Sequence, residues 1–138
     1  MNTDLSKSLE QLENKKWQEP PYPSYLVTTI YSLRRKPLKD YTIEDLRISI
    51  GQNCSLEYLI PIALEKLKKN ILAEGHFYEG DLLTNVLNSD ENFWKVNYNH
   101  WAAVKKVFEA NRTSLDEDEH KDILKDYKKF QEIHNERY

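Results

Sequence analysis

The segment from Leu56 to Asn70, LEYLIPIALEKLKKN, constrains the fold more than any other part of the chain. Its apolar residues recur at spacings of three and four, as they do on a helix. They also cover more than a narrow stripe, because they fall at Leu56, Leu59, Ile60, Ala63, Leu64 and Leu67. A helix that is apolar on several sides needs neighbours on each of those sides. The segment therefore predicts a central helix within a helical assembly, with a kink or short break at Pro61.

The same periodicity recurs along the chain in short pieces. It predicts further helices over residues 3–16, 25–35, 43–51, 81–88, 89–97, 97–111 and 115–138. The chain has only three glycines, and no segment alternates apolar and polar residues as a strand does. A length of 138 residues suits one domain. We therefore expect a single domain, residues 1–138, folded as an all-α bundle of about seven or eight short helices.

Proline, serine and threonine predict where these helices begin and end. The prolines of QEPPYPSY, residues 18–25, predict an extended connector after the first helix. The helix that follows should bury a stripe formed by Leu26, Ile30 and Leu33, and Pro37 should stop it.

The next two helices carry their own start and stop signals. Thr42 with Asp45 three residues later resembles a capping box, and Ser55 is placed to cap the central helix. We expect Gly51 to end the helix between them in a left-handed conformation.

The stretch EGHFYEGDLL holds two of the three glycines. Gly75 and Gly80 predict a compact loop, since glycine is favoured where φ is positive or where two segments approach closely. We expect Phe77 and Tyr78 to fold back from this loop onto the core. Asp81 or Gly80 is expected to cap the next helix, and the Asp81 carboxylate is expected to accept hydrogen bonds at its start. The stretch is no phosphate-binding loop, because it lacks a preceding strand and a GK[ST] ending.

Charge is distributed unevenly, although the whole chain carries only −3. Residues 70–94 hold five acids and no Lys or Arg, hence −5. Residues 95–112 hold four basic side chains and one acid, whereas residues 113–138 hold eight acids and five basic side chains. Two acidic patches are possible, and they favour a basic partner. The alternative is an ordinary solvated surface of mixed charge.

Residues 33–94 resemble the immunity proteins of bacterial contact-dependent growth inhibition (CDI) systems. The order and spacing of short elements carry the resemblance: Arg35-Lys36-Pro37-Leu38, Glu44-Asp45-Leu46-Arg47, Ile50-Gly51-Gln52, Leu59-Ile60-Pro61-Ile62-Ala63-Leu64, Gly75, Phe77-Tyr78, Gly80-Asp81-Leu82-Leu83 and Phe93-Trp94. His76 departs from the pattern where an acid is expected, and Glu79 where a proline is common. These departures concern the geometry of the loop rather than the family.

The resemblance implies a cytoplasmic protein, not an enzyme, that binds and neutralises the C-terminal toxin domain delivered by a neighbouring cell. Such toxins are often nucleases with basic substrate channels, which an acidic partner would attract. The chain would be a monomer alone and a heterodimer with its toxin. The candidate contact residues are Glu79, Asp90, Glu91, Trp94, Asp116, Glu117, Asp118 and Glu119. A structural role, outside the toxin-facing surface, is expected for Pro37, Asp45, Gly51, Pro61, Gly75, Tyr78, Gly80 and Asp81.

Other functions have weaker support in the sequence. The four histidines lack the spacing of metal ligands, the lone Cys54 has no evident histidine partner, and no cofactor motif is present. No membrane span or signal peptide is apparent. A helical adaptor or DNA-contacting regulator is the alternative, because two predicted helices flank Gly51 as in a helix-turn-helix. A small hydrolase would need a nucleophile constellation that we do not find, and direct nucleic-acid binding would need a larger basic face.

Overall fold

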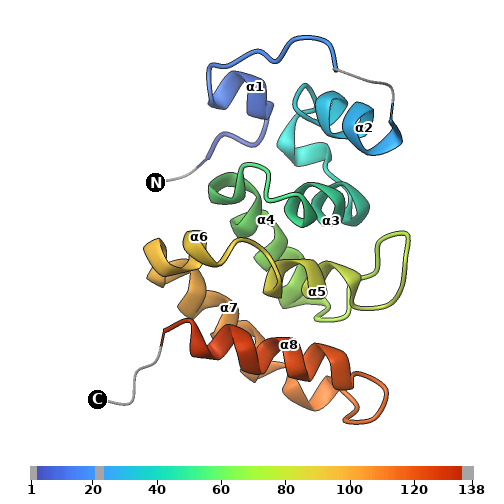
Figure 1. The fold of residues 1–138 in the computed structure, drawn as a ribbon, viewed down its shortest axis with the longest axis vertical. Helices are drawn as coiled ribbons and strands as arrows, with labels where there is room; N and C mark the ends of the chain where they lie inside the picture. Colours follow the sequence, from blue (N-terminus) through green and yellow to red (C-terminus); the bar gives the residue numbers. More distant parts are fainter. Residues whose placement is uncertain (1–2, 21–23, 135–138) are drawn as a thin grey trace.

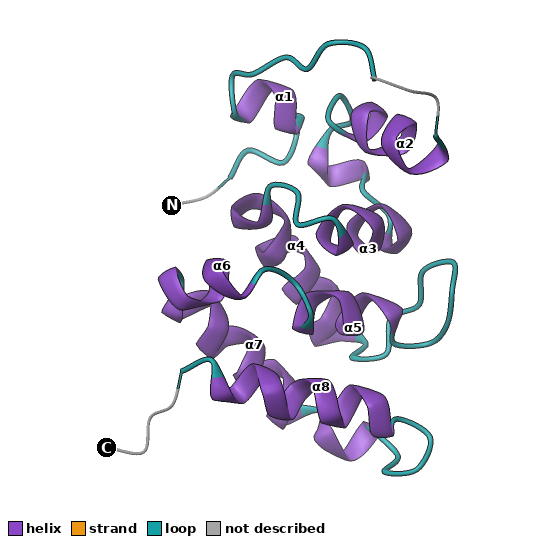
Figure 2. Cartoon of the chain, viewed as in Figure 1, coloured by secondary structure: helices purple, strands orange, loops and turns teal. Residues whose placement is uncertain are grey.

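The computed structural model describes residues 3–20 and 24–134. Within these residues the chain forms α-helices and two short 3-10 helices, and no strand (Figures 1 and 2). The elements are α1 (Leu9–Leu12), α2 (Tyr25–Leu33), η1 (Leu38–Asp40), α3 (Ile43–Gly51), α4 (Leu56–Lys69), α5 (Asp81–Leu87), α6 (Glu91–Val96), α7 (Tyr98–Ala110), η2 (Arg112–Ser114) and α8 (Lys121–Glu132). The expected all-α bundle of short helices is confirmed.

The central position of α4 is also confirmed. This helix contacts α3, α5 and α7, and α5 in turn contacts α3 and α8. Figure 1 shows the resulting stack, with α1 and α2 at one end and α8 at the other. All six apolar positions that predicted a central helix are buried: Leu56, Leu59, Ile60, Ala63, Leu64 and Leu67. The exposed face of α4 carries Glu57 and Glu65 along its length. Carboxylates on a recognition helix would repel the phosphates of DNA, so a helix-turn-helix function is disfavoured for α3 and α4.

Pro61 does not break α4, which runs without interruption from Leu56 to Lys69. Of the two expected effects of Pro61, a kink or a short break, the short break is therefore wrong. Proline removes a single backbone hydrogen bond from the helix. The packing of six buried side chains against three neighbouring helices holds the backbone helical across that missing bond.

Aromatic side chains fill the part of the core between α6, α7 and α8. The rings of Phe108 and Tyr127 stack with centroids 3.6 Å apart. The indole N–H of Trp101 donates to the Phe130 carbonyl at 2.8 Å. The indole N–H of Trp94 donates to the buried Ser89 hydroxyl at 3.0 Å. Buried indole N–H groups usually find such partners.

The first predicted helix, over residues 3–16, shrinks to Leu9–Leu12. Ser8 is its N-cap in a complete capping box, and Asn14 leaves the helix with a φ of 50°. Local side-chain capping therefore set the boundaries, where the spacing of leucines predicted a longer element. Pro21–Pro23 of the expected connector lie outside the described residues, as do residues 135–138 of the expected last helix.

The last helix begins at Lys121 rather than at residue 115. Oδ1 of Asp116 accepts the backbone N–H groups of both Asp118 and Glu119, each at 2.8 Å. Such local bonds compete with helix formation. The four acids 116–119 therefore lie in a turn before α8, not on the helix.

The ends of α3 agree only in part with expectation. Thr42 and Asp45 form the predicted capping box, and Lys36 adds an ion pair to Asp45 at 2.6 Å. Helix α3 ends at Gly51, as expected. Only the expected left-handed conformation of Gly51 is wrong, because the left-handed residue after α3 is Asn53, with a φ of 58°. A Cβ at Gly51 would lie 2.6 Å from Oδ1 of Asn85 on α5, so a larger residue there would displace the Asn85 side chain.

The start of α4 and the end of α2 also differ from the predicted signals. Ser55 is the N-cap residue of α4, but its hydroxyl donates to the Glu13 carboxylate at 2.8 Å instead of capping the helix. Helix α2 ends at Leu33, and Pro37 follows as the residue that opens η1. No helix among the described residues has the length and hydrophobicity that crossing a membrane requires.

Candidate interaction surface

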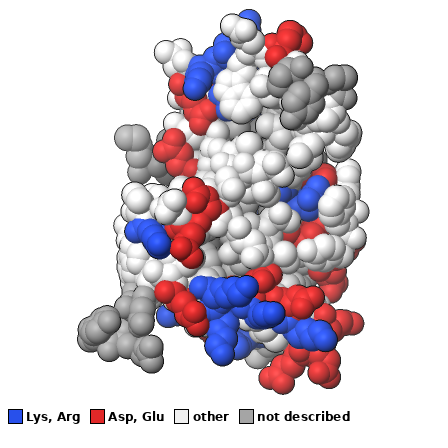
Figure 3. Space-filling model, viewed as in Figure 1, with Lys and Arg blue, Asp and Glu red and all other residues white. Residues whose placement is uncertain are grey.

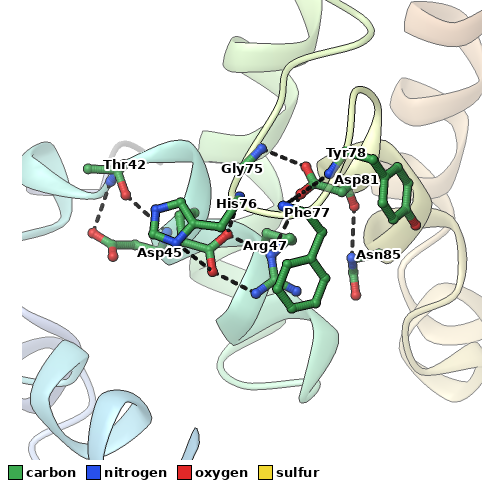
Figure 4. A network of polar contacts seen from close by, with 10 residues as sticks. Thr42, Asp45, Arg47, Gly75, His76, Phe77, Tyr78, Asp81 and Asn85 are labelled. Carbon is green, nitrogen blue, oxygen red and sulfur yellow. Dashed lines mark hydrogen bonds and ion pairs between the residues drawn. The ribbon is translucent and has the colours of Figure 1, made fainter. Parts of the chain in front are cut away.

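The loop between α4 and α5 is closed by a buried carboxylate (Figure 4). Asp81, with 0% of its surface exposed, accepts the backbone N–H of Gly75 at 2.6 Å and that of Phe77 at 3.0 Å. A third, longer hydrogen bond comes from the N–H of Tyr78 at 3.4 Å. Gly80, not Asp81, is the N-cap of α5. Of the two expected capping residues, Gly80 is therefore confirmed, whereas the Asp81 side chain binds the backbone of the preceding loop.

A second carboxylate ties the same loop to α3. Arg47 donates two hydrogen bonds to Glu44, at 2.7 and 2.6 Å, and its Nε lies 3.9 Å from the Asp81 carboxylate. Glu44 also accepts the backbone N–H of His76 at 2.9 Å. The hydrogen bonds from Arg47 are the main cause of a lowered pKa at Glu44, and the bonds to Glu44 raise the pKa of Arg47. Figure 4 shows Arg47, His76 and Asp81 close together at this loop.

Both glycines of the loop serve a steric purpose, as predicted. Gly80 has a φ of +87°, a conformation that other residues rarely adopt. At Gly75 the reason is close approach, because a Cβ would lie 2.6 Å from Oε1 of Glu44. Each glycine thus satisfies one of the two conditions that favour this residue.

The loop aromatics do not fold back onto the core, so that expectation is wrong. Phe77 is 69% exposed and Tyr78 is 49% exposed. Asp81 draws the loop backbone inwards, which leaves these side chains outside. The guanidinium of Arg47 lies 4.0 Å from the centroid of the Phe77 ring and supports it from beneath.

Phe77 shares a surface pocket of about 330 Å³ with the first turn of α2. Tyr25 and Leu26 contribute from α2, and both are exposed, so Leu26 does not belong to the buried stripe predicted for that helix. We call this the Phe77 pocket; its remaining lining is Glu44, Arg47, Ile48, Gly51, Gln52, His76 and Asn85. Sequence reasoning missed Tyr25 and Arg47. The available signal was an arginine on the inward-facing part of α3, where a charge needs a buried partner.

Acids from two distant segments meet beside this loop. The Glu79 carboxylate lies 3.4 Å from Nε2 of His120, and the Glu119 carboxylate lies 3.7 Å from the same atom. We define the acidic cluster as the five exposed residues Glu79, Asp116, Glu117, Asp118 and Glu119. Figure 3 shows Asp and Glu side chains gathered at the lower right, over the turn that precedes α8 in Figure 1, and Lys and Arg side chains along α8.

Nε2 of His120, beside the acidic cluster, acts as a hydrogen-bond donor rather than as a metal ligand. Ligand atoms of Glu79, Glu119 and His120 lie within 4.8 Å of one another, close enough to suggest a cation site. Nδ1 of His120, however, accepts the backbone N–H of Asp116 at 2.9 Å. A neutral ring then carries its proton on Nε2, which points to the carboxylates. Binding a metal there would require a ring without either proton.

The other predicted contact residues lie elsewhere. Asp90 is the N-cap of α6, and Glu91 pairs with Lys95 at 3.2 Å. Helix α6 lies on the opposite side of the view in Figure 1 from the turn before α8. Trp94 has 0% of its surface exposed, so the expectation that it contacts a partner is wrong: its ring is part of the core. The structure thus brings together five of the eight predicted residues and separates the remaining three.

The comparisons with known proteins point to one family. A family model described as CDI immunity proteins matches residues 11–104, which is more than half of the 138 residues. The matched range begins within α1 and contains α2 to α6, the loop with both glycines and the first half of α7. No curated protein and no solved structure matches the chain.

Proposed function

The chain belongs to the CDI immunity proteins, and from this premise we propose that it neutralises the toxin domain of its own CDI system by forming a one-to-one complex with it. We further propose that this toxin is a nuclease and that the complex blocks access of nucleic acid to it. Binding alone is sufficient for such inhibition, so the proposal requires no reaction on this chain.

The acidic cluster is the observation that carries this proposal. Its five carboxylates come from two segments that are far apart in the sequence, and all five residues are exposed. A nuclease must present a basic surface to its substrate, because the phosphate backbone of nucleic acid is anionic. Opposed charges speed the encounter and fix the orientation of the partners. Asp90 and Glu91 stay proposed contacts, at a second and separate position on the surface.

The first experiment is to co-express the chain with the toxin domain encoded immediately upstream, and to purify them together. Isothermal titration calorimetry should give a stoichiometry of one, and the chain should protect cells that express the toxin. Absence of a complex at micromolar concentrations of both proteins would refute the proposed function.

A second experiment tests the role of charge. The double variant Glu117→Lys with Asp118→Lys reverses two acids of the cluster and avoids Asp116, which shapes the turn. The matched control is Glu57→Lys with Glu65→Lys on α4, because these are also exposed acids and the change in net charge is identical. We expect the association rate to fall at least about tenfold at low salt in the first variant, and clearly less in the control. Equal rates for the two variants would remove the cluster from the interface.

A further inference from the structure

Hydrogen bonds to two carboxylates hold the loop that carries the exposed side chains of Phe77 and Tyr78. Asp81 and Glu44 together accept backbone N–H groups from Gly75, His76, Phe77 and Tyr78. Carboxylates are buried in proteins only when hydrogen bonds or charges compensate them. This network fixes the position of Phe77, although the Phe77 side chain is 69% exposed and contributes little to the core. An ordered, exposed aromatic side chain of this kind is typical of a binding surface.

The exposed apolar groups of this region face a common pocket. Tyr25, 73% exposed, and Leu26 line the Phe77 pocket from α2. Apolar side chains that gather on a surface in this way mark sites of interaction more often than isolated ones do. The backbone of the loop is already ordered, so Phe77 would lose little conformational freedom on binding.

The acidic cluster begins at the edge of this pocket. Glu79 follows Phe77 by two residues, and its carboxylate reaches His120 at 3.4 Å. In Figure 1 the loop between α4 and α5 lies between the start of α2 above and the turn before α8 below. An apolar centre with a charged rim is the usual anatomy of a protein interface, and aromatic residues at its centre carry most of the binding energy.

We propose that Phe77, Tyr25 and Leu26 form the apolar anchor of the toxin interface, and that the toxin inserts an apolar side chain into the Phe77 pocket while its Lys and Arg residues face the acidic cluster. This inference rests on the proposed function and names the surface that performs it. It departs from the expectation that the toxin-facing surface avoids the residues that carry the family resemblance, because Phe77 is one of those residues.

Charge favours a basic partner over a second copy of this chain. A symmetric dimer would place the same surface against itself. The acidic clusters of both copies would then lie at one interface, where like charges are unfavourable. A toxin domain with a basic surface meets no such repulsion.

The test compares the toxin affinity of three single variants. Phe77→Ala and Tyr25→Ala each remove one aromatic group from the pocket. Leu5→Ala is the control, because Leu5 is an apolar residue that is 43% exposed and does not line the Phe77 pocket. We expect the dissociation constant to rise about 30-fold in the first two variants, mainly through faster dissociation, and to stay within about twofold in the control.

Tyr25→Ala keeps the test valid if Phe77→Ala disturbs the contact with Arg47, since Tyr25 lies outside the network that holds the loop. Thermal unfolding of each variant alone verifies that the fold is intact. If both variants bind the toxin as tightly as the wild type, the inference is overturned while the proposed function stands. If the wild type itself forms no complex, the proposed function fails.

The oligomeric state supplies an independent outcome. Light scattering of the chain alone should give the mass of a monomer at the concentrations used for binding. A wild-type dimer that Tyr25→Ala converts to a monomer, with unchanged toxin affinity, would assign the pocket to self-association and overturn the inference.

Discussion

Replacing Asp81 by asparagine tests whether one buried carboxylate organises the loop between α4 and α5. The two side chains have nearly the same shape, but asparagine presents an NH₂ group where one carboxylate oxygen stood. Oδ1 of Asp81 accepts from Gly75, and Oδ2 accepts from Phe77 and Tyr78. Whichever oxygen becomes nitrogen, a donor then faces at least one backbone donor.

The expected cost follows from these contacts. A hydrogen bond to a charged group contributes about 1.5–3 kcal/mol, and a buried donor without a partner costs about 1–3 kcal/mol. The bond from Tyr78 is long and adds little, and the remaining oxygen still accepts as a neutral group. We therefore expect the free energy of unfolding to fall by about 3 kcal/mol. For a chain of this size the melting temperature should drop by about 10 °C.

Urea unfolding followed by circular dichroism measures this change in the free energy of unfolding. The control is Asp118→Asn, which makes the same chemical change at an exposed carboxylate and should change the free energy of unfolding by less than about 0.5 kcal/mol. Hydrogen exchange adds a local readout, because the amide protons of Gly75 and Phe77 should exchange faster in the Asp81 variant than in the wild type.

An Asp81→Asn protein as stable as the Asp118→Asn control would refute this account of the loop. So would a loss of stability without faster exchange at Gly75 and Phe77, since the carboxylate would then act through something other than those two amides.

Three further changes have expected outcomes. Gly80→Ala should lower the free energy of unfolding by about 2 kcal/mol, because alanine is strained at a φ of +87°; unchanged urea unfolding would contradict this. Ser89→Ala should cost about 1–3 kcal/mol, since the buried Trp94 N–H would lose its acceptor; a melting temperature equal to that of the wild type would count against that bond. Burial is the main cause of a raised pKa at Tyr127, with its hydrogen bond to Glu109 second, so this tyrosine contributes stability that is fully present below pH 10 and is lost as the pH rises above it. Tyr127→Phe should therefore lose less stability between pH 9 and 11 than the wild type does, and parallel pH profiles of unfolding would exclude this origin.

Helix caps and apolar spacing predicted the helices well, because both depend only on residues that are close in the sequence. The capping box of Thr42 and Asp45 needs only a short stretch of chain, and it is present as predicted. The apolar spacing from Leu56 to Leu67 also requires no knowledge of the partner helices, and all of its apolar positions are buried. Boundaries were less predictable. The Asp116 carboxylate binds the backbone of its own turn, so α8 begins only at Lys121, although the sequence of residues 115–120 is compatible with a helix.

The candidate surface could be predicted only in part. The two glycines indicated a constrained loop, and the acids indicated a negative surface. The sequence did not reveal that Phe77 points outwards. Its direction depends on the carboxylates of Asp81, on α5, and Glu44, on α3, which bind the backbone N–H groups of the loop. Nor did it separate Trp94 from the exposed aromatics, since burial of that ring depends on α7 and α8 covering it.

By itself, the sequence determined that this chain is all-helical, that one central helix is surrounded by others, and that its family is that of the CDI immunity proteins, because periodicity, caps and motif order are properties of nearby residues. The tertiary structure alone decided which acids share a surface and which aromatic residues reach solvent. Glu79 and Glu119 are 40 positions apart and meet at one histidine, and only the packing of α5 against α8 brings them together.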